Sequence, residues 1–248
     1  MDNVGYLSLT NAAMIGRATD VTANNIANAN TDGFRAGRIT FEEMVSETGA
    51  EGPLDEMSYA IDVGTWSDTA EGALVATGNP FDLALQGGGW FGFQTEEGET
   101  AVGRVGQLTK TDDGALVTAG GDSLLGAGGG PVLLPPEATE ISIARDGTIS
   151  TPNGDVIGQV GIFQADEAHT WKRQAGGMLL APGDAGPLVP AVDGNVLQGF
   201  VEKSNVDPIG EMMRLINLQR AYERSMNLAD SADQLRSDTL SRLGKPAT

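Results

Sequence analysis

The stretch "ANNIANANTDGFR", residues 23–35, places four asparagines within seven positions of a segment that otherwise has the pattern of a helix. Asparagine is unfavourable in a helix interior, where each one costs about 0.5 kcal/mol relative to alanine, or about 2 kcal/mol for the whole stretch. Such a helix needs compensation from outside the segment. The asparagines therefore predict contacts with other parts of the chain or with neighbouring molecules.

Both ends of the chain have the spacing of long helices with an apolar seam. Asp207 followed by Pro208 is a favourable start for a helix, and neither proline nor glycine occurs between residues 211 and 243. A helix over 208–243 would be roughly 54 Å long. The seam positions keep the three-four spacing of a coiled coil, and they are Leu7, Met14, Val21, Leu215, Leu218, Tyr222 and Ala229.

An ordinary amphipathic core helix has the same spacing as this seam, so spacing alone does not separate the two. Half of the N-terminal seam is polar or small, and neither end can bury much apolar area by itself. This favours two terminal helices that pack against each other and then against neighbouring copies. Asparagines buried in such a seam fix register and partner choice at a cost in stability.

Charge is unevenly distributed along the 248 residues. The net charge is −19, and it arises between residues 41 and 200, because acidic and basic residues balance at both ends. An excess of this sign excludes nucleic acid and anionic membrane surfaces as partners. We expect no membrane span, since no run of 18 apolar residues occurs, and no cleaved signal peptide, since the first basic residue is Arg17.

The centre of the chain has the pattern of short strands. "FDLALQ" at 81–86 alternates, and the pairs Asp113-Gly114 and Asp146-Gly147 stand between short apolar runs, as hairpin turns do. The predicted fold is α+β, with terminal helices at 1–30 and 205–248 forming a coiled-coil-like pair. An extended connector is expected at 31–77 and an all-β domain at 78–204.

Candidate chemistry is sparse. "GGGWFG" at 87–92 has the spacing of a dinucleotide-binding loop, but a strand-like run follows it where that loop needs a helix, so a tight connection between strands is favoured. His169 is the only histidine and the chain has no cysteine, which leaves no set of zinc ligands. We predict no catalytic residue, no cofactor and no metal site.

Three segments, in order along the chain, resemble signatures of the bacterial flagellar rod and hook family. They are "LTNAAMIGRATDVTANNIANANTDGFRAGRITFEEMV" near the start, "TGNPFDLALQGGGWF" in the centre and "SNVDPIGEMMRLINLQRAYERSMNLADSADQL" near the end. The matching positions of the first signature are Asn24, Asn25, Ile26, Asn28, Thr31, Gly33 and Phe34. Those of the last are Asn205, Gln219, Arg220 and Tyr222.

The resemblance implies a non-enzymatic subunit of the rod that crosses the periplasm in the flagellar basal body, most like the proximal rod members of the family, with the distal rod members as the alternative. It implies passage through the flagellar export apparatus and assembly with copies of itself and with neighbouring rod proteins. The terminal helices would form an inner, torque-transmitting tube with the β-domain outside. A secreted adhesin and, less favoured, a glycine-rich-loop nucleotide-binding enzyme are the other functions considered.

Overall fold

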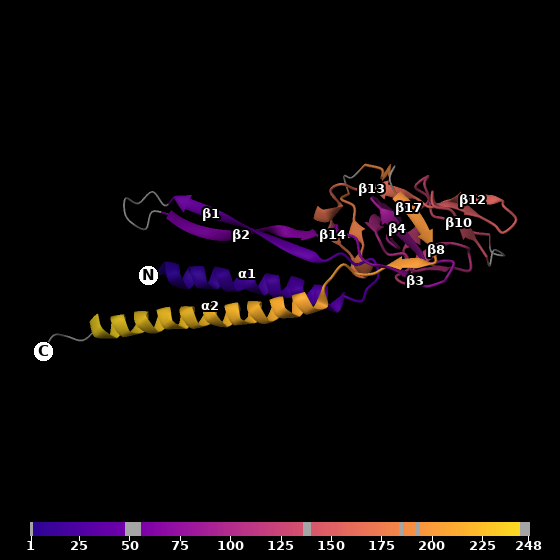
Figure 1. Ribbon diagram of the computed structural model, residues 1–248. Helices are drawn as coiled ribbons and strands as arrows, with labels where there is room; N and C mark the ends of the chain where they lie inside the picture. The colour runs from indigo at the N-terminus through magenta and orange to yellow at the C-terminus, as the bar shows by residue number, and fades with distance from the viewer. Residues whose placement is uncertain (1, 48–55, 136–139, 184–185, 192–193, 244–248) are drawn as a thin grey trace. The chain divides into compact units, whose positions relative to one another are not determined.

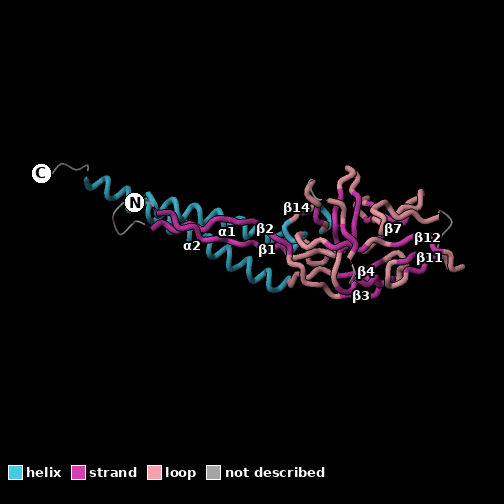
Figure 2. Tube along the Cα trace, turned by 90° about the horizontal axis from the view of Figure 1, so that it is seen from above, coloured by secondary structure: helices cyan, strands magenta, loops and turns pink. Residues whose placement is uncertain are grey.

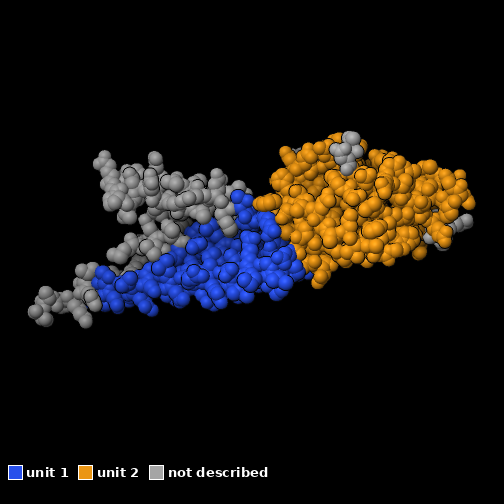
Figure 3. Space-filling view, in the orientation of Figure 1, with its two compact units in different colours: residues 1–27, 37–65, 207–248 blue, residues 28–36, 66–206 orange. Residues whose placement is uncertain are grey.

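The computed structural model describes residues 2–47, 56–135, 140–183, 186–191 and 194–243. The chain divides into two compact units, which Figure 3 colours separately. Unit 1 comprises residues 1–27, 37–65 and 207–248, and unit 2 comprises residues 28–36 and 66–206. Each unit thus contains pieces from distant parts of the sequence.

Unit 1 contains both terminal helices, α1 (Asp2–Ala27) and α2 (Pro208–Leu243), which lie side by side (Figures 1 and 2). The predicted C-terminal helix is confirmed, and it begins where expected: the Asp207 carboxylate accepts a hydrogen bond from the Ile209 N–H at 3.1 Å. None of the described helices combines the length and apolar character that a membrane span requires.

Small side chains are among the buried residues of the two helices, and a hydrogen bond joins the helices directly. Ala12 and Ala18 of α1 are buried, and the Ser225 hydroxyl of α2 donates a hydrogen bond to the Ser8 carbonyl at 2.9 Å. Short side chains let the two backbones approach closely, but they bury little apolar area. The described buried residues of α1 and α2 therefore contribute little apolar area.

A two-stranded sheet completes unit 1. It pairs β1 (Gly37–Glu47) with β2 (Glu56–Ser67), and β1 packs beside α1 (Figure 1). Residues 31–77, expected as a single extended connector, are divided in the structure between this sheet, the segment 28–36 of unit 2 and the start of the unit 2 strands. The backbone of β1 and β2 is extended, as expected of the connector, but the two strands are also hydrogen-bonded to each other.

Unit 2 is built from short antiparallel strands. Among its described residues, one nine-stranded sheet has the order β14-β15-β6-β5-β9-β8-β7, with β13 joining β5 to β16; β10-β11-β12 form a second sheet, and β17-β4 and β18-β3 are separate pairs. The bounds are β3 Leu74–Ala76, β4 Leu83–Gly87, β5 Trp90–Gln94, β6 Thr100–Gly103, β7 Leu108–Lys110, β8 Leu116–Thr118, β9 Ser123–Leu124, β10 Ser142–Ile143, β11 Thr148–Ser150, β12 Val156–Gln159, β13 Ile162–Gln164, β14 Lys172–Arg173, β15 Leu179–Leu180, β16 Val189–Pro190, β17 Gly194–Gln198 and β18 Phe200–Glu202. Two short 3-10 helices, η1 (Ala168–Thr170) and η2 (Ala175–Gly177), lie between strands.

The two predicted hairpins are confirmed. β7 pairs with β8 around Gly114, and β10 pairs with β11 around Gly147; both glycines have a positive φ, of 86° and 83°. The "GGGWFG" segment joins the end of β4 to the start of β5, so it is a connection between strands. The core of unit 2 gathers around Phe91 and Phe93 of β5.

Candidate functional site

Asn25 of the opening stretch holds the start of β1 within unit 1. This side chain is buried, and its amide forms two hydrogen bonds with the backbone of one residue: Nδ2 donates to the Gly37 carbonyl at 2.9 Å, and Oδ1 accepts from the Gly37 N–H at 2.7 Å. An amide can satisfy a buried donor and acceptor in this way at a helix end. The helix cost of Asn25 is thus offset by a contact twelve residues along the chain.

The other asparagines of the stretch have different surroundings. In unit 2, Asn28 accepts a hydrogen bond from the Thr31 hydroxyl at 3.2 Å, and the Thr31 N–H donates to the Asn28 carbonyl at 3.1 Å. These bonds close a turn directly after α1. Asn24 is an exposed residue of α1, and Asn30 is an exposed residue of the turn.

Gly33 and Phe34 lie in the interior of unit 2. The Gly33 N–H donates to the Glu202 carbonyl at 2.6 Å, and its φ is +72°. A Cβ at Gly33 would come within 2.4 Å of the Arg104 carbonyl carbon. Phe34 is buried, and the Arg173 guanidinium lies 4.9 Å from the centre of its ring. Only glycine combines this φ with so close a backbone approach.

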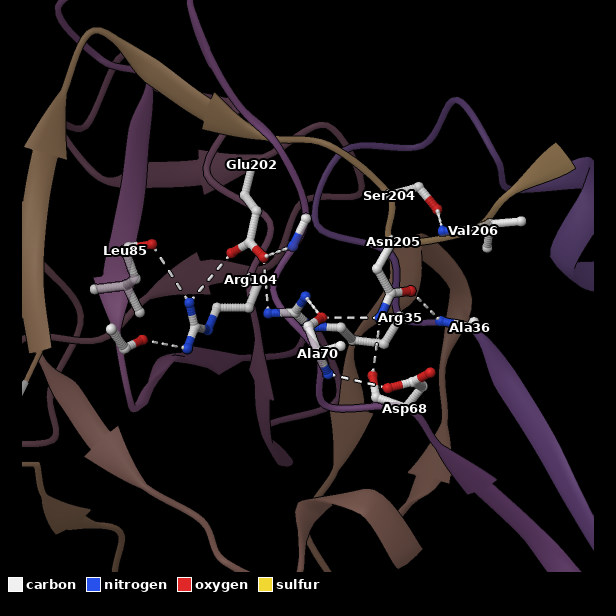
Figure 4. Close-up of polar contacts among 12 residues, drawn as sticks. Arg35, Ala36, Asp68, Ala70, Leu85, Arg104, Glu202, Ser204, Asn205 and Val206 are labelled. Atoms are coloured by element: carbon white, nitrogen blue, oxygen red, sulfur yellow. Dashed lines mark hydrogen bonds and ion pairs between the residues drawn. The ribbon is translucent and has the colours of Figure 1, made fainter.

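Asn205 joins three segments of unit 2 through its amide (Figure 4). Its Oδ1 accepts from the Ala36 N–H at 2.6 Å, and its Nδ2 donates to the carbonyls of Asp68 at 3.1 Å and Ala70 at 2.9 Å. The Asn205 N–H also donates to the Phe34 carbonyl at 3.3 Å. A residue of the C-terminal signature therefore holds the N-terminal signature segment in place.

Beside Asn205 lies an ionic cluster of Arg35, Arg104 and Glu202, all between 1% and 4% exposed. The Glu202 carboxylate is 2.8 Å from Nη2 of Arg35 and 3.2 Å from Nη1 of Arg104, and it also accepts from the Gly72 N–H at 2.8 Å (Figure 4). One carboxylate thus serves two guanidinium groups and a backbone donor.

Backbone carbonyls and an aromatic ring surround the two arginines of the ionic cluster. Arg35 donates to the Ala70 carbonyl, and Nη2 of Arg104 donates to the Gly87 carbonyl at 2.7 Å. The ring centre of Trp90 lies 5.8 Å from the Arg35 guanidinium carbon and 5.6 Å from that of Arg104.

The charge balance of this cluster depends on Glu202. Burial lowers the pKa of Arg35, and the neighbouring Glu202 carboxylate opposes this effect. Burial likewise lowers the pKa of Arg173. Carbonyl oxygens accept from one guanidinium nitrogen of Arg35 and from both Nη atoms of Arg104, whereas the buried Nε atoms of the two arginines have no hydrogen-bond partner among the described residues. Two buried cations with one anion therefore depend strongly on that anion. This cluster was not predicted from the sequence, although Arg35 lies within the first signature segment and Glu202 lies two residues before the last one.

The predicted seam residues occupy mixed positions in unit 1. Leu215, Leu218 and Ala229 of α2 are partly buried, whereas Tyr222 is 44% exposed. Met14, Val21 and Ile26 of α1 are partly buried, and the side chain of Leu7 lies outside the described residues. Gln219 and Arg220 of the C-terminal signature are exposed.

A second face of α2 carries large apolar side chains that are about half exposed or more. Ile209, Met212, Met213 and Ile216 are between 47% and 71% exposed. They recur at i, i+3, i+4 and i+7 and therefore share one side of the helix, which we call the outward apolar face. An exposed apolar pattern of this kind is typical of a contact surface. Among the described residues, no group of three or more His, Cys, Asp and Glu side chains is placed to hold a metal ion.

Three segments of the chain match known protein families. Residues 16–35 match "Flagella basal body rod protein", residues 84–151 match "Flagellar hook protein FlgE/F/G D1 domain", and residues 197–243 match "Flagellar basal body rod FlgEFG protein C-terminal". The first match contains Asn25 and Arg35, and the second contains Arg104. The third contains Glu202, Asn205 and the outward apolar face.

Whole-chain relatives agree with these matches. The flagellar basal-body rod protein FlgF of Mesorhizobium japonicum is 36% identical over 92% of this chain and 94% of its own length. FlgF of Caulobacter vibrioides is 33% identical over 99% of both chains, and FlgG of the same bacterium is 31% identical over 87% of this chain and 90% of its own. The chain belongs to the flagellar rod and hook protein family. Within that family it is a basal-body rod protein, a structural and not an enzymatic subunit.

Proposed function

We propose that this chain is the proximal rod subunit, and that it assembles through its terminal helices with copies of itself and with neighbouring rod proteins. The alignment with FlgF of Caulobacter vibrioides extends over nearly the whole chain, whereas the alignment with FlgG of that bacterium is shorter. FlgF is the proximal and FlgG the distal rod protein, so the greater coverage by FlgF within this one bacterium supports the proximal position over the distal one.

The observation that carries the assembly proposal is the outward apolar face of α2. Four large apolar side chains on two helical turns are exposed to water in the single chain. Burying a side chain of this kind contributes about 1.5–3 kcal/mol, so contact with a neighbouring helix stabilises the assembled state. A set of such contacts repeated along the rod transmits torque through helices instead of flexible loops.

The contact between α1 and α2 supports coupled ordering and assembly. The buried residues of the two helices are mainly small or polar, such as Ala12, Ala18 and Ser225, and they supply little apolar area for helices of 26 and 36 residues. Neighbouring subunits provide the remaining area, in the coiled-coil-like arrangement predicted from the seam. Passage through the export apparatus fits helices that gain their full stability only on assembly.

The position along the rod is tested by deleting the gene in its own bacterium and analysing purified basal bodies by mass spectrometry. Because distal subunits are added onto proximal ones, the deletion should also remove the FlgG protein of that bacterium from the basal bodies. The outward apolar face is tested in the same cells with Ile216→Glu, which places a charge in the proposed contact. This variant should abolish swimming and leave the melting temperature of the purified chain unchanged.

The matched control is Asn217→Glu, an exposed position one residue further along α2 that lies beside the outward apolar face. Cells with this variant should swim. FlgG retained in the deletion strain would contradict the proximal position, and swimming cells with Ile216→Glu would contradict the role of the outward apolar face.

A further inference from the structure

Unit 2 contains a hollow of about 590 Å³ that has no part in the proposed assembly contacts. It lies beside β14 and β15, and its other described lining residues come from η1, from the start of β6 and from positions 182, 183, 186 and 187. The residues that matter to its chemistry are Glu99, Glu167, Trp171, Lys172, Leu180 and Leu188. A volume of several hundred Å³ is in the range of small-molecule sites.

One wall of the hollow is a fixed aromatic ring. Trp171 follows η1, and its backbone N–H donates to the Ala168 carbonyl at 3.1 Å. Its side chain packs against the buried cluster of Trp90, Val102, Ala168 and Leu179, as does Leu188. Packing against a core holds the indole in one orientation, so the wall is formed before any ligand arrives.

The rim combines charges of both signs. Lys172 of β14 stands opposite Leu180 of β15 in the antiparallel pair, which places both side chains on the same face of the sheet. Glu99 and Glu167 add two carboxylates. Within the described part of the chain, these three charged groups form no ion pair with one another or with other residues, and they have hydrogen-bonding capacity for a ligand.

This combination selects one class of ligand. An anion meets two carboxylates and a chain of net charge −19, and a purely cationic ligand offers no acceptor to the Lys172 ammonium. An apolar ligand makes no hydrogen bond with any of the three charged groups, which are exposed at the rim. A sugar ring offers an apolar C–H face to the indole and hydroxyl groups that donate to carboxylates and accept from an ammonium.

We propose that the hollow bounded by Trp171, Glu99, Glu167 and Lys172 binds an uncharged saccharide. Trp171 is the stacking platform, the two carboxylates accept from ring hydroxyls, and Lys172 donates to a hydroxyl or acetamido oxygen. This site lies in unit 2 and is independent of the outward apolar face on α2.

The test is a titration of the full-length chain with tri-N-acetylchitotriose, followed by isothermal calorimetry, with maltotriose as a second uncharged probe. We expect saturable binding with a Kd of about 1 mM, as suits a shallow site with few polar contacts. Trp171→Ala should weaken binding at least about tenfold, which corresponds to the loss of one stacking contact. Glu167→Gln and Lys172→Ala leave the packed cluster intact. Each of them should weaken saccharide binding severalfold.

Trp66→Phe serves as the matched control, because Trp66 is a partly exposed tryptophan of unit 2 that does not line the hollow. This variant should bind like the unmodified chain. Binding should change little with added salt, because the ligand is uncharged. The proposal is overturned if neither saccharide binds, if Trp171→Ala, Glu167→Gln and Lys172→Ala all retain full affinity, or if the hollow binds tetra-lysine in a salt-dependent manner and neither sugar.

Discussion

Replacing Glu202 with glutamine is expected to lower the free energy of unfolding of unit 2 by about 3–5 kcal/mol, because the change removes the one anion of a buried ionic cluster. The carboxylate lies within 3.2 Å of both guanidinium groups, and the side chain is only 1% exposed. Without it, Arg35 and Arg104 are two buried cations held only by carbonyl oxygens and the Trp90 ring. The loss therefore exceeds that of an ordinary hydrogen bond.

Urea titration followed by tryptophan fluorescence measures this effect, since all three tryptophans, Trp66, Trp90 and Trp171, belong to unit 2. The next residue along the chain provides a matched control. Lys203 forms an ion pair with Asp32 at 2.7 Å, but it is 44% exposed, and Lys203→Met should cost less than about 1 kcal/mol. Equal losses for the two variants would contradict the role assigned to the ionic cluster.

Replacing Gly33 with alanine should destabilise unit 2 by about 3–5 kcal/mol, from the combined cost of a left-handed backbone and of overpacking. The φ of Gly33 is +72°, and a Cβ there would lie 2.4 Å from both the Arg104 carbonyl carbon and the Val105 nitrogen. Those atoms are backbone, so they cannot rotate away as a side chain does. The segment 28–36 has to shift, which also weakens the hydrogen bond from Gly33 to Glu202.

Gly98→Ala separates these two costs. Gly98 has a similar φ of +82°, but nothing lies within 4 Å of its expected Cβ. Its replacement should cost only the backbone term, about 1–2 kcal/mol in the same urea titration. A Gly33→Ala variant no less stable than Gly98→Ala would show that the close approach to Arg104 is not a constraint on the fold.

Local patterns predicted the elements whose cause is local. The Asp207-Pro208 pair marked the start of α2, and the Asp-Gly pairs marked two hairpins, because capping and turn geometry depend on adjacent residues. Alternation in "FDLALQ" was less informative. Ala84 and Asp82 are buried together with Leu83, since this strand is covered on both faces, and alternation is expected only of half-buried strands.

The ionic cluster could not be predicted, because its members are far apart in sequence. Arg104 and Glu202 are separated by 98 positions, and nothing in the residues around Arg104 distinguishes it from a surface arginine. A long helix likewise does not reveal which of its faces a neighbouring element covers. The seam spacing selected Leu215 and Leu218, which are partly buried and whose role in a seam stays a prediction. The outward apolar face became apparent only from the exposure of its side chains in the structure.

The most direct test of assembly through the outward apolar face is the reactivity of a single thiol. The variant Met213→Cys places one cysteine in a chain that otherwise has none. In the purified single chain, Met213 is 61% exposed, and the thiol should react rapidly with a maleimide. In purified basal bodies it should be protected by a neighbouring helix and become reactive again after the rods are dissociated. A thiol that reacts equally fast in intact basal bodies and in the single chain would contradict assembly through the outward apolar face.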